Sequence, residues 1–137
     1  MKCICLCLLF LILSCKSKED IMLDKFYGQW AIEEIKYNNV NYKQDLYVNF
    51  MAFEENNKVL IPESIHFEKD NIAEWKIDLN NKIISINCVD QVFNGSYNVK
   101  FIKDENKKLL GIEMNSDSTY IKAYKFFQNY YLHKRDW

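Results

Sequence analysis

The chain has 137 residues, of which 49% are hydrophobic and 15% aromatic, with 3 glycines and 1 proline. This composition excludes disordered, collagen-like and disulfide-scaffold chains, and it predicts one small folded domain. The 18 basic and 19 acidic side chains nearly balance, so no excess of positive charge indicates a nucleic-acid partner.

The N-terminal residues have the pattern of an export signal. Lys2 precedes an apolar run over residues 3–14. This run has the length of a signal-peptide hydrophobic region. It is too short to cross a bilayer as a helix, which takes about 20 residues. We therefore expect residues 1–14 to be removed and to take no part in the fold.

The end of this run, Ile12-Leu13-Ser14-Cys15, resembles the lipobox of bacterial lipoproteins. In that motif a small residue precedes a cysteine that is lipidated on sulfur and becomes the new N-terminus. The resemblance implies acyl chains such as palmitate on Cys15, a polar tether over residues 15–20, and stable attachment to a membrane. An ordinary secretory signal with an incidental cysteine is the alternative.

The resemblance also bears on location. The residue after the lipidated cysteine is Lys16 rather than aspartate, which favours the outer membrane over retention at the inner one. Cys88 is then the only cysteine left unmodified, because the three others leave with the signal. No disulfide can form within one mature chain, so the fold depends on its hydrophobic core.

Downstream of the tether, apolar residues from Ile21 to Phe26 predict a short helix that ends near Gly28. Beyond it the dominant hydrophobic period is two, which is typical of strands with one wet face. We predict strands over residues 30–37, 47–53, 58–61, 73–79, 84–88, 97–101, 110–114, 119–126 and 130–134. The pair Glu33-Glu34 interrupts the first of these and predicts a bulge. Asn80-Asn81 predicts a two-residue hairpin turn.

Eight or nine short strands at this spacing are typical of an antiparallel sandwich or barrel. Closing the sheet removes its exposed edges. We therefore expect residues 21–137 to form an all-β, up-and-down barrel of about eight strands behind a short helix, with a β-sandwich as the alternative.

The segment around Gly28-Gln29-Trp30 resembles the Gly-x-Trp signature of the lipocalin group. Glycine permits a tight turn from helix to strand, and the tryptophan plugs the closed end of the barrel. The resemblance implies a basic residue near the last strand that packs across the indole, for which Arg135, the only arginine, is the candidate. The Thr-Asp-Tyr motif of larger lipocalins is not visible. Alternatively, Trp30 is an ordinary core residue and Arg135 a solvated charge.

No catalytic or metal-binding constellation stands out. His66 and His133 lack metal-ligand spacing, and Cys88 closes an apolar strand face where a buried, unreactive thiol is expected. Glu54 and Glu55 adjoin a predicted turn and point to opposite faces, unlike paired catalytic carboxylates. We expect no enzyme, no cofactor and no metal.

The lipocalin resemblance implies a non-catalytic binding module that takes a small apolar or amphipathic ligand at the open mouth of the barrel. The alternative is a structural or interaction subunit that docks an envelope protein through aromatic residues. Ligand-binding residues are not identified by the sequence. A cavity of roughly 300 Å³ or more favours the first function, and a filled interior with an exposed aromatic patch favours the second.

Overall fold

The computed structural model describes residues 17–66, 72–106 and 108–126. Cys15, His133, Arg135 and the predicted strand over residues 130–134 lie outside the described residues.

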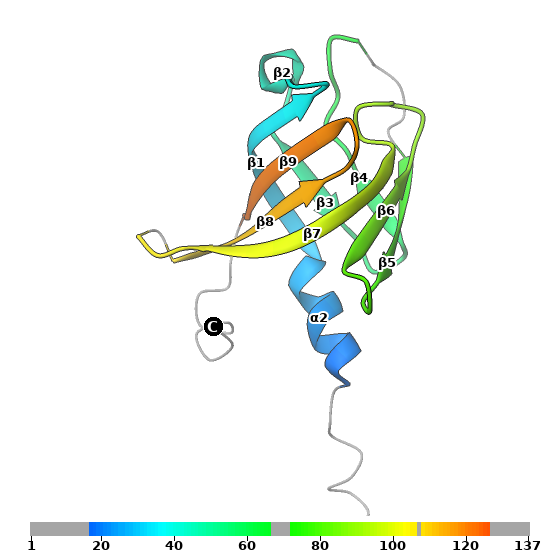
Figure 1. Ribbon diagram of the computed structural model, residues 1–137, viewed down its shortest axis with the longest axis vertical. Helices are drawn as coiled ribbons and strands as arrows, with labels where there is room; N and C mark the ends of the chain where they lie inside the picture. The colour runs from blue at the N-terminus through cyan, green and yellow to red at the C-terminus, as the bar shows by residue number, and fades with distance from the viewer. Residues whose placement is uncertain (1–16, 67–71, 107, 127–137) are drawn as a thin grey trace, which may run out of the picture.

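The described chain forms a closed, antiparallel β-barrel (Figure 1). Its elements are α2 (Lys18–Phe26), β1 (Gly28–Tyr37), β2 (Val40–Asn41), the 3-10 helix η2 (Lys43–Asp45), β3 (Phe50–Phe53), β4 (Lys58–Leu60), β5 (Ile72–Asp78), β6 (Ile83–Asn87), β7 (Gly95–Asp104), β8 (Leu109–Asn115) and β9 (Thr119–Lys125). Each barrel strand pairs with its neighbour in sequence, and β1 pairs with β9 to close the cylinder. The expected up-and-down barrel of eight strands is confirmed, with β2 as one extra strand.

The bulge predicted in β1 is present. The pairing of β1 with β9 shifts register between Ile32 and Glu34. Because of this shift, Ile32 and Ile35 both face the interior and are buried, although an unbroken two-residue alternation would place them on opposite faces.

The turn between β5 and β6 is longer than the predicted two residues. Asp78 pairs with Ile83, so residues 79–82 form a four-residue loop. The Asp78 carboxylate accepts hydrogen bonds from the backbone amides of Asn80 and Asn81, at 3.0 and 3.1 Å. Lys82 completes the loop with φ of +55°. The aspartate therefore accepts hydrogen bonds from loop amides that would bond to the opposite strand in a tighter hairpin.

The strand β2 was not expected. It forms because Asn38 and Asn39 both adopt positive φ, at 50° and 65°, in a two-residue turn that pairs Tyr37 with Val40. Asparagine tolerates this conformation better than most residues. The Asn-Asn pair is therefore the sequence feature from which this hairpin could have been predicted.

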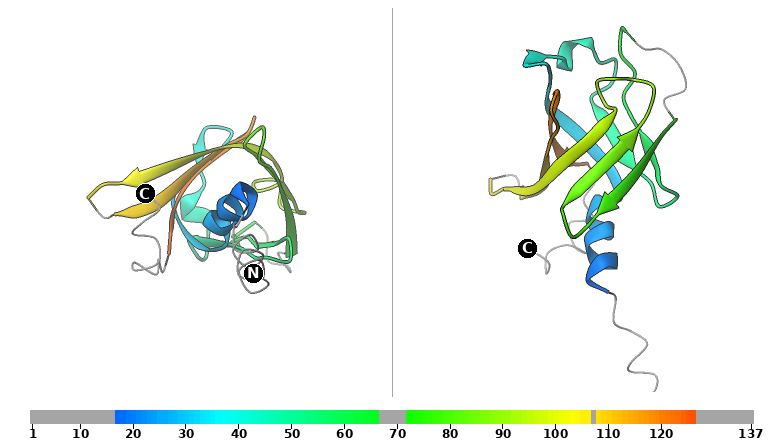
Figure 2. Two further views of the ribbon diagram at one scale, coloured as in Figure 1. Left: turned by 90° about the horizontal axis from the view of Figure 1, so that it is seen from below. Right: turned by 45° about the vertical axis from the view of Figure 1, so that its right-hand side comes forward.

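The helix α2 begins at Lys18, inside the stretch predicted to be a tether. Ser17 and Asp20 form a capping box, in which the Ser17 hydroxyl accepts from the Asp20 amide and the Asp20 carboxylate accepts from the Ser17 amide. This cap satisfies amides that the first turn leaves without helical partners. The helix lies at one end of the barrel, below β1 in Figure 1, and in the view from below it stands in front of the middle of the ring of strands (Figure 2).

Candidate functional site

Trp30 occupies the helix end of the barrel. Its side chain is fully buried, and its Nε1 donates a hydrogen bond to the backbone oxygen of Phe26 at 2.7 Å. Gly28, between them, has φ of +107°, a conformation that favours glycine. The helix-to-strand turn thus has the local geometry expected from the Gly-x-Trp segment.

The cation that packs across this indole in the described chain is Lys125. Its Nζ lies 5.5 Å from the centroid of the Trp30 ring and donates hydrogen bonds to the backbone oxygens of Asp24 and Lys25, at 3.2 and 2.8 Å. Burial lowers the pKa of Lys125 to about 8, and the Asp24 carboxylate acts in the opposite direction. The alternation of β9 turns Lys125 inward, and the pairing of β9 with β1 places it opposite Trp30.

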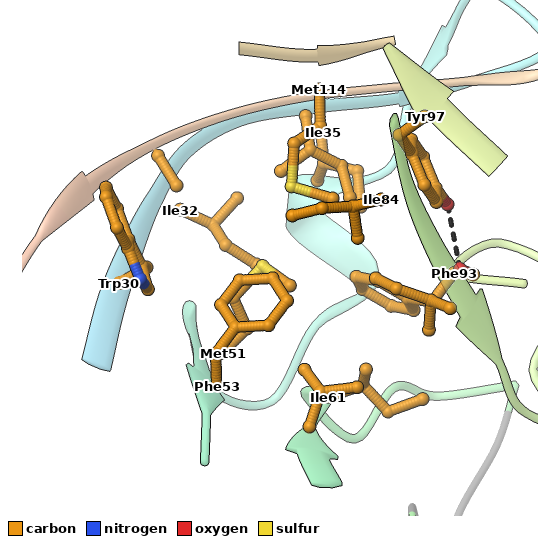
Figure 3. Close-up of a cluster of buried hydrophobic side chains, with 14 of the residues drawn as sticks. Trp30, Ile32, Ile35, Met51, Phe53, Ile61, Ile84, Phe93, Tyr97 and Met114 are labelled. Atoms are coloured by element: carbon orange, nitrogen blue, oxygen red, sulfur yellow. Dashed lines mark hydrogen bonds between the residues drawn. The ribbon is translucent and has the colours of Figure 1, made fainter. Parts of the chain in front are cut away.

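The centre of the barrel is occupied by its own side chains. Figure 3 shows aliphatic and aromatic groups from opposite walls meeting there. These buried residues include Trp30, Ile32, Ile35, Met51, Phe53, Ile61, Ile84, Phe93, Tyr97 and Met114. A barrel of eight strands is just wide enough for side chains to fill it, and the side chains of these buried residues pack together in its centre.

At the end of the barrel away from α2, buried hydrogen bonds hold the described loop residues against the strands. The Tyr97 hydroxyl donates to the backbone oxygen of Phe93 at 2.8 Å, and the Thr119 hydroxyl donates to that of Val92 at 2.7 Å. Tyr42 donates to the Ser64 hydroxyl at 3.0 Å. This is the end where the lipocalin resemblance implies the open mouth.

A partly enclosed groove of about 310 Å³ lies instead at the helix end. It runs between α2, the tip of the β5–β6 hairpin and β7. Its lining consists of Met22, Phe26, Ile77, Leu79, Lys82, Val99, Lys100 and Phe101. The Phe26 and Phe101 rings lie 5.0 Å apart between centroids. Sequence analysis did not predict this groove, because it joins a helix to strands far along the chain.

The groove continues toward the first turn of α2. A wider, more polar hollow of about 560 Å³ adjoins it and shares Met22, Ile77 and Leu79 with its lining. Lys18 and Asp78 stand at this outer part. The hollow is therefore apolar toward the barrel and polar toward the start of the helix.

Of the reactive residues considered from the sequence, Cys88 and His66 lie in the described part of the chain, and each has its own separate contacts. Cys88 is half-buried, its Sγ donates to the backbone oxygen of Asp90 at 3.2 Å, and burial raises its pKa to about 11. This keeps the thiol protonated at neutral pH, where the thiolate would be the nucleophile. His66 is exposed, with its Nε2 3.6 Å from an Asp45 carboxylate oxygen. The described residues contain no group of three or more histidine, cysteine or acidic side chains that could hold a metal.

Asp90 is a buried carboxyl that sequence analysis did not single out. Its Oδ1 accepts from the Val92 amide at 2.9 Å, while its Oδ2 has no hydrogen-bond partner in the described part of the chain. Burial raises its pKa. The contact with Val92 orders the loop over the barrel end.

Several large hydrophobic side chains are exposed on and beside β3 and β4. Tyr47, Phe50, Leu60 and Ile65 are large hydrophobic residues that are each at least 40% exposed. They lie on β3, β4 and the segments that adjoin these strands, which are tied by the bridge between Leu46 and Ser64.

No protein family, curated protein or solved structure that was compared with the chain matches it. In the described ranges no helix has both the length and the apolar character needed to cross a bilayer.

Proposed function

We propose that this protein is a lipid-anchored binding module of the bacterial outer membrane, facing the periplasm or the cell surface. It would take a small apolar or amphipathic ligand, without covalent chemistry. The observation that carries the proposal is the groove between α2, the β5–β6 tip and β7. Its volume of about 310 Å³ falls at the lower end of the range for small-molecule sites, about 300–1,000 Å³.

The groove has the chemical character such a ligand requires. Met22, Phe26 and Phe101 provide an apolar floor, so a hydrocarbon group that enters leaves water. The lysines at positions 82 and 100 give one side of it a polar rim. An apolar pocket with a few polar groups is the usual form of a ligand site.

The position of the groove agrees with the proposed anchor. Ser17, which caps α2, follows Cys15 by two residues, a span of at most roughly 7 Å. Acyl chains on Cys15 would hold the start of α2 near the membrane surface, and the polar hollow beside Lys18 would face the same side. A ligand that partitions into membranes would therefore be concentrated near the groove.

Docking of an envelope protein is the second candidate function. The exposed residues Tyr47, Phe50, Leu60 and Ile65 favour it, because exposed apolar groups that gather on a surface commonly mark protein contacts. The cluster of buried side chains in the barrel centre is consistent with this alternative.

Binding of dodecanol, a single-chain alcohol, tests the groove. The protein used is the chain from residue 15 with Cys15→Ser, which contains every described element. We expect saturable binding by calorimetry, and a loss of at least about tenfold when Val99→Phe fills the groove. The matched control, Val40→Phe, makes the same change at the other end of the barrel, where Val40 is 68% exposed, and should leave affinity unchanged.

Two results would contradict the groove as the ligand site. If the original chain binds no dodecanol, or if a folded Val99→Phe variant binds it as well as the control does, the groove is not the ligand site. Capture of one envelope protein that is lost on Phe50→Ser would then support the docking function.

A further inference from the structure

The narrow groove has a one-sided charge distribution. Its lining includes two lysines, Lys82 and Lys100, and no acidic side chain. Both lysines lie on the side formed by the β5–β6 tip and β7, opposite α2. A ligand in the groove would therefore meet positive charge at one side and hydrocarbon elsewhere.

Lys82 is the cation of this pair that is available to a ligand. It is exposed, and no ion-pair partner for it exists among the described residues. Its backbone oxygen accepts from the Val99 amide at 2.9 Å, which fixes its Cα beside the groove wall. Lys100, by contrast, has a carboxylate oxygen of Glu113 at 3.9 Å from its Nζ.

The acidic residues nearby are engaged or placed elsewhere. Asp78, in the same hairpin tip, accepts from the amides of Asn80 and Asn81 and from the Asn81 side chain. Glu19 stands on the first turn of α2 and lines only the wider hollow. Neither carboxylate is paired with Lys82, so the lysine keeps its capacity for an anion.

From this charge complementarity we infer that the groove binds a single-chain carboxylate amphiphile, a fatty acid, with its carboxylate at Lys82 and its chain against Phe26, Val99 and Phe101. The inference rests on the proposed ligand-binding function and specifies its ligand. The apolar volume suits one chain of medium length. A two-chain phospholipid would leave most of its hydrocarbon outside a groove of about 310 Å³.

Paired ligands that differ only in the head group test this assignment. Dodecanoate, dodecanol and dodecyltrimethylammonium are compared by calorimetry, each below its micelle concentration, on the chain from residue 15 with Cys15→Ser. We expect dodecanoate to bind about three- to tenfold more tightly than dodecanol, because a contact between opposite charges that is exposed or half-buried adds this much affinity. The cationic ligand should bind more weakly than both.

Lys82→Gln should abolish the preference for dodecanoate over dodecanol, so that the two ligands bind with equal affinity. The matched control is Lys108→Gln, because Lys108 is also an exposed turn lysine with positive φ, at 53°, and does not line the groove. The control should keep the full preference.

The outcomes separate the two hypotheses. If the original chain binds dodecanol and dodecanoate equally, or if Lys82→Gln retains the preference, the carboxylate assignment is wrong while the groove remains a ligand site. If neither ligand binds the original chain, the proposed binding function itself fails.

Discussion

Trp30 and Lys125 are direct partners in the pairing of β1 with β9, and the Lys125 ammonium lies 5.5 Å from the centroid of the indole ring. The same ammonium donates to two backbone oxygens at the end of α2. One side chain thus connects the first strand, the last strand and the helix. These contacts join the β1–β9 seam, which closes the barrel, to the helix that walls the groove.

Replacing Lys125 should change how stability depends on pH. Its pKa is lowered by burial from 10.5 to about 8 in the folded chain, so between these values the unfolded chain binds more protons. Stability attributable to Lys125 therefore rises with pH over this window. We expect wild type to gain free energy of unfolding relative to Lys125→Met between about pH 8 and about pH 10.5, measured by urea unfolding.

The control for this pH series is Lys36→Met. Lys36 also carries its ammonium near an aromatic ring, 5.8 Å from the centroid of Tyr120, but it is exposed. This variant should follow the wild-type pH profile. A Lys125→Met profile parallel to wild type would show that the buried ammonium does not titrate in this range.

Trp30→Ala should destabilise the domain by about 3–5 kcal/mol, because it removes a fully buried aromatic side chain. Trp30→Phe keeps a ring but leaves the Phe26 carbonyl without its indole donor, so we expect a smaller loss of about 1–3 kcal/mol. Chemical denaturation measures both, with Val40→Ala as an exposed control expected within about 0.5 kcal/mol of wild type. An unchanged unfolding midpoint in Trp30→Ala would contradict the role of Trp30 as a plug.

Gly111 should not tolerate a side chain. A Cβ at this position would lie 2.6 Å from Cγ1 of Ile102 and 2.8 Å from the Tyr124 ring. We expect Gly111→Ala to cost about 1–3 kcal/mol by overpacking. In a Tyr124→Ala background the cost should be smaller, and a double-mutant cycle measures this coupling. Equal costs in both backgrounds would mean that the tyrosine ring is not what excludes the side chain.

Cys15→Ser should release the protein from the membrane fraction, since the cysteine sulfur is the proposed attachment site for the acyl chains. Cys88→Ser is the matched control and should remain in membranes, because Cys88 is half-buried in the barrel. Fractionation followed by immunoblotting distinguishes the two. Membrane retention of a processed Cys15→Ser chain would overturn the lipid anchor.

Much of the fold could be predicted because its signals are local. Two-residue alternation placed most strands, and the pair Glu33-Glu34 located the bulge in β1. Short turns were less reliable, since the Asp78 carboxylate lengthened one loop and Asn38-Asn39 formed a hairpin that was not expected. Side-chain hydrogen bonds within a few residues decided these cases.

The candidate site was much less predictable. The groove joins Met22 and Phe26 of α2 to Val99 and Phe101 of β7, and no spacing along the chain reports that proximity. The cation over Trp30 was expected near the end of the chain at Arg135, which lies outside the described residues. Lys125 became identifiable only from the pairing of β9 with β1.

Taken alone, the sequence determined the all-β class, the approximate strands and the Gly-x-Trp turn, because alternation and turn conformation depend on residues close together in the chain. The lipid anchor stays a prediction from the leader. Tertiary structure alone decided that side chains fill the barrel and that the groove lies beside α2. Those features depend on how strands from both ends of the chain close around a limited volume.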